Sequence, residues 1–157
     1  GVTKGMKLAG LLIFFSDIHS LGVKNTEGLQ FTTSWYWDMN DESRKFAEKF
    51  FAKTKRMPTD VQAADYSAVT QYLKAVQAVG STDADKVMAH LKSTPLSDFY
   101  AKGTIRPDGT YAHDMYLVEV KKPEESKRPW DYLKVLSTLP ADQVWTTKAE
   151  TKCALWK

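Results

Sequence analysis

The sequence contains a single cysteine, Cys153, so no disulfide can form within the chain and cysteine usage indicates no redox compartment. A long hydrophobic run is also missing. The longest apolar stretch, residues 8–15, is well short of the roughly 20 residues that a membrane-spanning helix needs. Neither a disulfide scaffold nor a helical membrane span is therefore predicted.

An excess of charge of one sign is absent as well. The chain has 22 basic and 19 acidic residues, a net charge of +3, and the Lys and Arg residues form no run. This pattern argues against a nucleic-acid partner. Glycine-rich phosphate loops, paired cysteines, the HExxH zinc motif and the nucleophile elbow are all missing, so the sequence predicts neither an enzyme nor a cofactor.

Residues 8–15 (LAGLLIFF) carry no charge and no polar side chain. A continuous apolar run of this length predicts a strand buried on both faces. It stops at a polar cluster that contains Ser16, Asp17 and His19. Because open α/β sheets place their ligands at the carboxyl ends of strands, this cluster is the predicted ligand site.

Two interpretations of Asp17 remain open. Asp17 and His19 are too few ligands for a zinc site, and a catalytic triad within four residues is geometrically implausible. Asp17 could cap a following helix, with His19 on the surface, or it could hold a polar or cationic group of a ligand. Position in the sequence does not decide between these two.

The remaining segments predict an α/β domain. Residues 29–37 form a second strand that ends in three aromatic residues, and helices follow at about 41–56, 60–79 and 82–91. Tyr66 lies off the apolar stripe of the long helix, so it could reach a cleft or solvent. A turn at Arg106-Pro107-Asp108-Gly109 is predicted to join a short strand at 103–106 to a longer strand at 115–121, and 130–136 could form one more. The tail from residue 146 is expected to be loose.

The chain looks incomplete. A strand buried on both faces needs a neighbour on each edge, and few strands are supplied. The first residues enter that strand almost at once and include no initiator Met. We therefore expect the chain to be part of a longer protein.

These segments, in this order and spacing, resemble the C-terminal part of a type I periplasmic binding protein. The segments are LAGLLIFFSDIHSLG, EGLQFTTSWYWDMNDESRKFAEKFF, PTDVQAADYSAVTQYLKAV and IRPDGTYAHDMYLVEVKKPEESKRPWDYLK. The most similar group is the substrate-binding proteins of branched-chain amino acid (leucine/isoleucine/valine-type) ABC transporters.

The resemblance implies a fold class and a division into lobes. The fold would be an incomplete α/β, three-layer αβα arrangement with parts of two Rossmann-like lobes joined by three crossover strands. Residues 1–34 would belong to the C-terminal lobe, and 35–105 would hold a crossover and helices of the N-terminal lobe. Residues 106–157 would form the return hairpin, more of the C-terminal lobe and the tail.

The resemblance also implies a function. An ABC importer's binding protein would capture an amino acid or a related small or aromatic carboxylate and deliver it to membrane permease subunits. It would be periplasmic, with a signal peptide in the missing N-terminal part. Asp17 matches the acidic residue that receives the ligand's ammonium group in amino-acid-binding members, and Ser16, His19, Tyr36 and Tyr66 complete the expected ligand-binding set. A ligand-sensing domain of a receptor or regulator with the same fold is the alternative.

Overall fold

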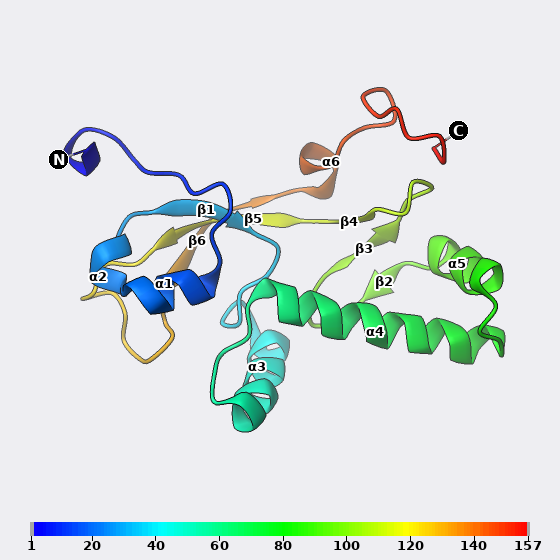
Figure 1. Ribbon diagram of the computed structural model, residues 1–157, viewed down its shortest axis with the longest axis horizontal. Coiled ribbons are helices and arrows are strands. Elements are labelled where there is room, and N and C mark those ends of the chain that lie inside the picture. Colours follow the sequence, from blue (N-terminus) through cyan, green and yellow to red (C-terminus); the bar gives the residue numbers. More distant parts are fainter. Residues whose placement is uncertain (1, 157) are drawn as a thin grey trace. The chain divides into compact units, whose positions relative to one another are not determined.

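The structure is a computed structural model that describes residues 2–156, and the chain divides into two compact units (Figure 1). Unit 1 runs to Asp60 and also includes Met115–Leu139. Unit 2 comprises Val61–Asp114 and the chain from Pro140 onward. The chain therefore passes from one unit to the other three times, after Asp60, after Asp114 and after Leu139.

Unit 1 is built on an antiparallel sheet of three strands in the order β1-β5-β6. Its strands are β1 (Gln30–Thr33), β5 (Met115–Val120) and β6 (Leu133–Leu139). Its helices are the short η1 (Val2–Lys4), α1 (Phe15–Leu21), α2 (Val23–Thr26) and α3 (Asp41–Thr54). Figure 1 shows α1 and α2 together beside this sheet.

The core of unit 1 includes buried side chains of α1 and of β5, the central strand of the sheet. Ile18 and Val118 are completely buried, and Phe31, which pairs with Val118 across β1 and β5, is only 4% exposed. Each buried aliphatic or aromatic side chain of this kind contributes about 1.5–3 kcal/mol relative to an exposed one. The Phe15 ring of α1 also lies 5.4 Å from that of Tyr132, directly before β6, which holds α1 beside this end of the sheet.

The helix predicted at 41–56 is confirmed as α3. The side chain of Asn40 accepts a hydrogen bond from the Ser43 backbone N–H at 2.9 Å, which caps the first turn. The chain leaves the helix at Lys55, which adopts a left-handed conformation (φ 60°). The indole Nε1 of Trp35 donates to the buried Ser43 hydroxyl at 2.9 Å and ties the helix to the chain after β1.

The buried strand predicted at residues 8–15 is wrong. Only Ala9 pairs with another strand, in a parallel bridge to Gln30, while Leu11 is fully exposed and Leu12 is 78% exposed. Phe15 already belongs to α1. Among the described residues, this segment has a β-sheet partner on one edge only, so it lacks the neighbours that a strand buried on both faces requires.

Unit 2 combines two longer helices and one short helix with a small antiparallel sheet, β2-β3-β4. The helices are α4 (Asp60–Val79), α5 (Ala84–Ser93) and the short α6 (Ala141–Val144). The strands are β2 (Leu96–Ser97), β3 (Lys102–Ile105) and β4 (Tyr111–His113). The core of unit 2 consists of Ala75, Val87, Leu91 and Leu96.

The predicted turn at 106–109 is present, because the Gly109 N–H donates to the Arg106 carbonyl at 2.9 Å. The prediction that this turn joins β3 to the strand at 115–121 is wrong. β3 pairs with β4, whereas β5 lies in the sheet of unit 1. The strand predicted at 115–121 is present as β5, whereas β4 was not predicted. Both sheets are antiparallel, and the mixed α/β architecture holds.

Candidate functional site

The predicted site lies on α1. Asp17 is in the first turn of this helix, and its Oδ2 accepts a hydrogen bond from the Phe14 backbone N–H at 2.8 Å. This bond satisfies a backbone donor that the helix start would otherwise leave unpaired. The capping role foreseen for Asp17 is thus confirmed. Oδ1 accepts no hydrogen bond from the part of the chain that the structure describes.

Ser16 and His19 are exposed on the same helix. The His19 ring stacks on Trp130, with centroids 3.8 Å apart and planes 16° from parallel. Its Nδ1 lies 2.9 Å from the Tyr132 hydroxyl. His19 is therefore a surface residue that joins α1 to the chain before β6.

Tyr36 lies beneath this surface and is 5% exposed. Its hydroxyl donates to the Trp130 carbonyl at 3.0 Å and accepts from the Tyr132 N–H at 3.1 Å. Burial raises the pKa of Tyr36 above its ordinary value, so the hydroxyl stays protonated. A ligand could reach this hydroxyl only by displacing one of these backbone bonds.

The predicted set is divided between the two units. Unit 1 holds Ser16, Asp17, His19 and Tyr36, whereas Tyr66 belongs to α4 in unit 2. The Tyr66 side chain is 59% exposed, and its ring meets the edge of Phe99 at 5.9 Å.

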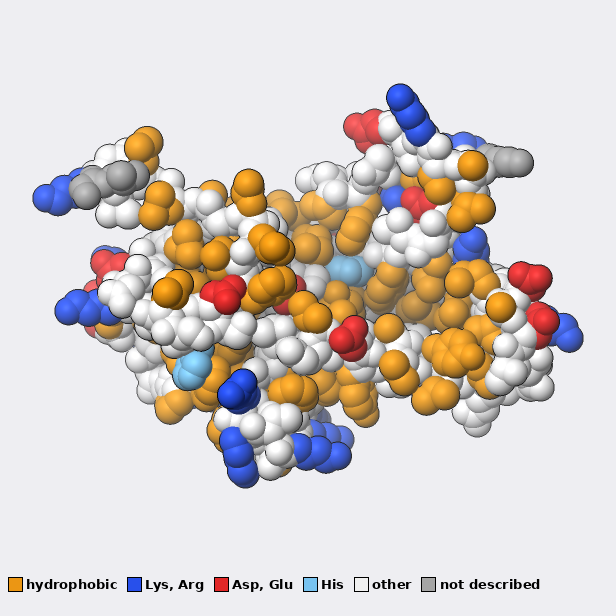
Figure 2. Space-filling model, in the orientation of Figure 1, with side chains coloured by type: hydrophobic (Ala, Val, Ile, Leu, Met, Phe, Trp, Pro, Cys, Tyr) orange, Lys and Arg blue, Asp and Glu red, His pale blue; other side chains and the backbone are white. Residues whose placement is uncertain are grey.

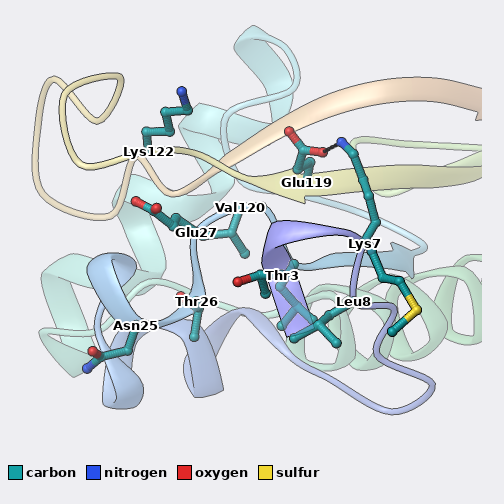
Figure 3. Close-up of a pocket in the computed structure, with 12 residues that line it drawn as sticks. Thr3, Lys7, Leu8, Asn25, Thr26, Glu27, Glu119, Val120 and Lys122 are labelled. Carbon is teal, nitrogen blue, oxygen red and sulfur yellow. Dashed lines mark hydrogen bonds and ion pairs between the residues drawn. The ribbon is translucent and has the colours of Figure 1, made fainter. Parts of the chain in front are cut away.

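Unit 1 also contains a cavity of about 390 Å³ that sequence reasoning missed (Figure 3). Glu119 lies on its wall and accepts hydrogen bonds from Lys7 at 2.6 Å and Gln30 at 2.7 Å. Lys134 completes the ion pairing at 3.0 Å. These three partners lower the pKa of Glu119 to about 2, so its carboxylate is ionised and fully paired at neutral pH.

Further polar side chains line this cavity beside apolar ones such as Leu8 and Val120. Figure 3 shows that Lys7 reaches Glu119, while Glu27 and Lys122 extend from the opposite part of the wall. Asn25 and Thr26, at the end of α2, also line it. Glu119 stands in an apolar stretch of the sequence. This pattern could have identified it as a paired residue, because a carboxylate in a run of apolar residues needs a hydrogen-bonding or charged partner.

Unit 2 has a larger, more apolar cavity of about 510 Å³ between α4, α5 and the β2-β3-β4 sheet. Ser67 and Gln71 on its α4 wall both donate to Asp98, at 2.6 and 2.9 Å. Figure 2 shows hydrophobic side chains gathered on the visible face around α4 and α5. Several large ones on α4 are exposed, namely Val61, Tyr66, Val69, Tyr72 and Leu73.

Two kinds of site are not found among residues 2–156. No group of three or more His, Cys, Asp or Glu side chains could hold a metal ion. None of the described helices combines the length and the apolar character that crossing a membrane requires.

The family described as periplasmic binding protein matches residues 1–127. A solved periplasmic binding protein from Burkholderia mallei is 63% identical, with a TM-score of 0.95 over 100% of this chain and 42% of its own. The chain belongs to the periplasmic binding protein family. No match was found among curated proteins.

Two further solved binding proteins extend this comparison. A branched-chain amino acid ABC transporter ligand-binding protein from Burkholderia xenovorans is 44% identical, with a TM-score of 0.93 over 98% of this chain and 41% of its own. A leucine-, isoleucine-, valine-, threonine- and alanine-binding protein from Brucella ovis, in a closed conformation, shares the fold at 16% identity and a TM-score of 0.76. The alignment covers 98% of this chain and 42% of the Brucella protein. This chain thus spans about two fifths of the length of these relatives, which are described as periplasmic binding and ligand-binding proteins.

Proposed function

We propose that this chain is part of the substrate-binding component of an ABC importer. The complete protein would capture an amino acid, or a related small or aromatic carboxylate, between two lobes. Membership of the periplasmic binding protein family is the observation that carries the proposal. The three passages of the chain between its two units agree with it, because a protein that closes on a ligand needs two bodies joined by short connections.

Asp17 is the proposed contact for a ligand's ammonium group. Its Oδ2 is used by the helix cap, and its Oδ1 accepts no hydrogen bond from residues 2–156. An ionised carboxylate can accept bonds at both oxygens, so capping and ligand binding are compatible. Ser16 and His19 would contribute from the same helix, and Tyr66 would contribute from the other unit.

The proposed mechanism is capture and delivery, with no bond made or broken. A ligand that touches both lobes stabilises the closed state, because only that state makes contacts from both sides. The closed protein would then dock on membrane permease subunits. The proposal includes a periplasmic location and a signal peptide in the longer protein.

The test is calorimetric titration of the full-length protein with L-leucine, L-isoleucine, L-valine and benzoate. We expect at least one to bind in the micromolar range or tighter. If none binds, the proposed solute class is refuted.

Asp17→Asn tests the site, because asparagine keeps an oxygen for the helix cap but removes the charge. For an amino acid, we expect binding at least about tenfold weaker, the equivalent of about 1.4 kcal/mol. Asp85→Asn is the matched control, since Asp85 is an exposed first-turn aspartate of α5. Unchanged affinity in Asp17→Asn would refute the contact.

A further inference from the structure

The segment after β6, residues 140–156, makes specific contacts with unit 2. The sequence predicts a loose tail from residue 146, but the structure holds it at two places. It follows the third passage between the units, after Leu139. The contacts that hold this segment on unit 2 therefore determine whether the third passage restrains the relative motion of the two units.

The first anchor lies directly after the passage. The Ala141 N–H donates to the Asp114 carboxylate at 2.9 Å. Trp145 comes directly after α6, and its indole N–H donates to the His113 carbonyl at 2.7 Å. The Trp145 ring also meets the edge of the His113 ring at 5.5 Å. Both partners lie at the end of β4, so the segment is tied to the small sheet of unit 2.

The second anchor is Arg106, at the turn that follows β3. Its Nη1 donates to the Thr146 carbonyl at 2.9 Å, and its guanidinium lies 4.2 Å from the centre of the Trp156 ring. An ion pair with Asp108 at 2.9 Å holds the same guanidinium in place. One arginine therefore binds the segment near its start and near its end.

We propose that residues 140–156 act as a strap that limits the motion of the two units during ligand capture. The inference rests on the proposed function only where it concerns the ligand. The first two passages, after Asp60 and after Asp114, each connect a folded segment of one unit directly to a folded segment of the other. The third leads into the strap, which Asp114, Trp145 and Arg106 bind to the rest of unit 2.

Loosening the strap has a defined physical consequence. With two restraining connections instead of three, the unliganded protein would sample more relative orientations of its units. Closing on a ligand would then cost more conformational entropy, and the affinity would fall. The strap is thus a positioning element, and none of its residues needs to touch the ligand.

The test uses the double variant Trp145→Phe/Trp156→Ala of the full-length protein. Phenylalanine keeps an aromatic ring at 145 but removes the indole donor, and Trp156 contributes only from the strap side of the second anchor. Neither residue belongs to β3 or β4, so the sheet of unit 2 should remain folded. The control is Leu155→Ala, because Leu155 is adjacent to Trp156 and 70% exposed.

The readout is single-molecule energy transfer between dyes on the two units, without ligand. Cysteines at the exposed positions Lys24 in α2 and Lys86 in α5 carry the dyes, with Cys153 replaced by serine. We expect the double variant to broaden the distance distribution by about twofold, and solute affinity to fall by about threefold to tenfold. The control should match the parent in both.

An unchanged distance distribution in the double variant overturns the strap, whether or not a solute binds. A broadened distribution supports it on its own. If the distribution broadens but leucine, isoleucine, valine and benzoate all fail to bind the parent, the strap stands and the proposed solute class falls.

Discussion

Replacing Glu119 with glutamine should remove a pH-dependent part of the stability of unit 1. Glu119 is 8% exposed, and Lys7, Gln30 and Lys134 bind its carboxylate. These partners lower its pKa from 4.5 to about 2. The ionised form is therefore favoured by folding.

The structure sets the magnitude. Each tenfold change in the acid dissociation constant corresponds to about 1.36 kcal/mol, so a pKa that falls from 4.5 to about 2 gives at most about 3.4 kcal/mol. The Lys7 side chain is 69% exposed and that of Lys134 is 36% exposed, so solvent screens both ion pairs. We expect a free energy difference of about 1–2 kcal/mol at pH 7.

The sign follows from the direction of the pKa change. Because the pKa is lower in the folded state, the contribution is fully present above about pH 4.5 and is lost as the pH falls toward about 2. Urea unfolding of the wild type and of Glu119→Gln should show their difference shrinking by more than half between pH 6 and about pH 3. Glu124→Gln, at an exposed loop position, is the control. A difference that stays constant over this range would refute the reasoning.

Two substitutions test the packing directly. Tyr36→Phe removes a hydroxyl that bonds three backbone groups, so we expect a loss of about 1–3 kcal/mol in urea unfolding. Tyr72→Phe, at a partly exposed ring, should have little effect, and equal losses would contradict this role. Gly103→Ala would place a Cβ 2.1 Å from the Ala112 carbonyl oxygen and force β3 and β4 apart. Its melting temperature should fall clearly, whereas Gly5→Ala, which meets nothing within 4 Å, should melt like the wild type.

Local sequence signals predicted the three longest helices, α3, α4 and α5, well. The long helix spans Asp60–Val79, as its apolar pattern and the glycine at 80 indicate. Gly80 has φ of 64°, a conformation that glycine adopts without strain. Such signals depend on neighbours within a few residues, so a helix prediction based on them does not require knowledge of distant contacts.

Contacts between distant segments could not be predicted in this way. Lys7 and Glu119 are 112 residues apart, and no local pattern relates them. The stacking of His19 on Trp130 likewise depends on the sheet that brings α1 and the chain before β6 together. The strand prediction for residues 8–15 was wrong for a related reason. An apolar run indicates that the segment would be buried if neighbouring strands were present, but it does not indicate whether the chain contains them.

Asp17 shows how a local rule and a functional hypothesis can both apply to one residue. Sequence position left capping and ligand binding as alternatives, and the structure establishes the cap through Oδ2. A cap holds the carboxylate rigidly at the start of α1, while Ile18, the next residue, is completely buried and fixes the helix. A preorganised carboxylate loses less entropy when it binds an ammonium group than a freely rotating one would. The cap is therefore a reason to test Asp17 as a ligand contact and not a reason to dismiss it, and the Asp17→Asn variant separates the two roles because only the charge is lost.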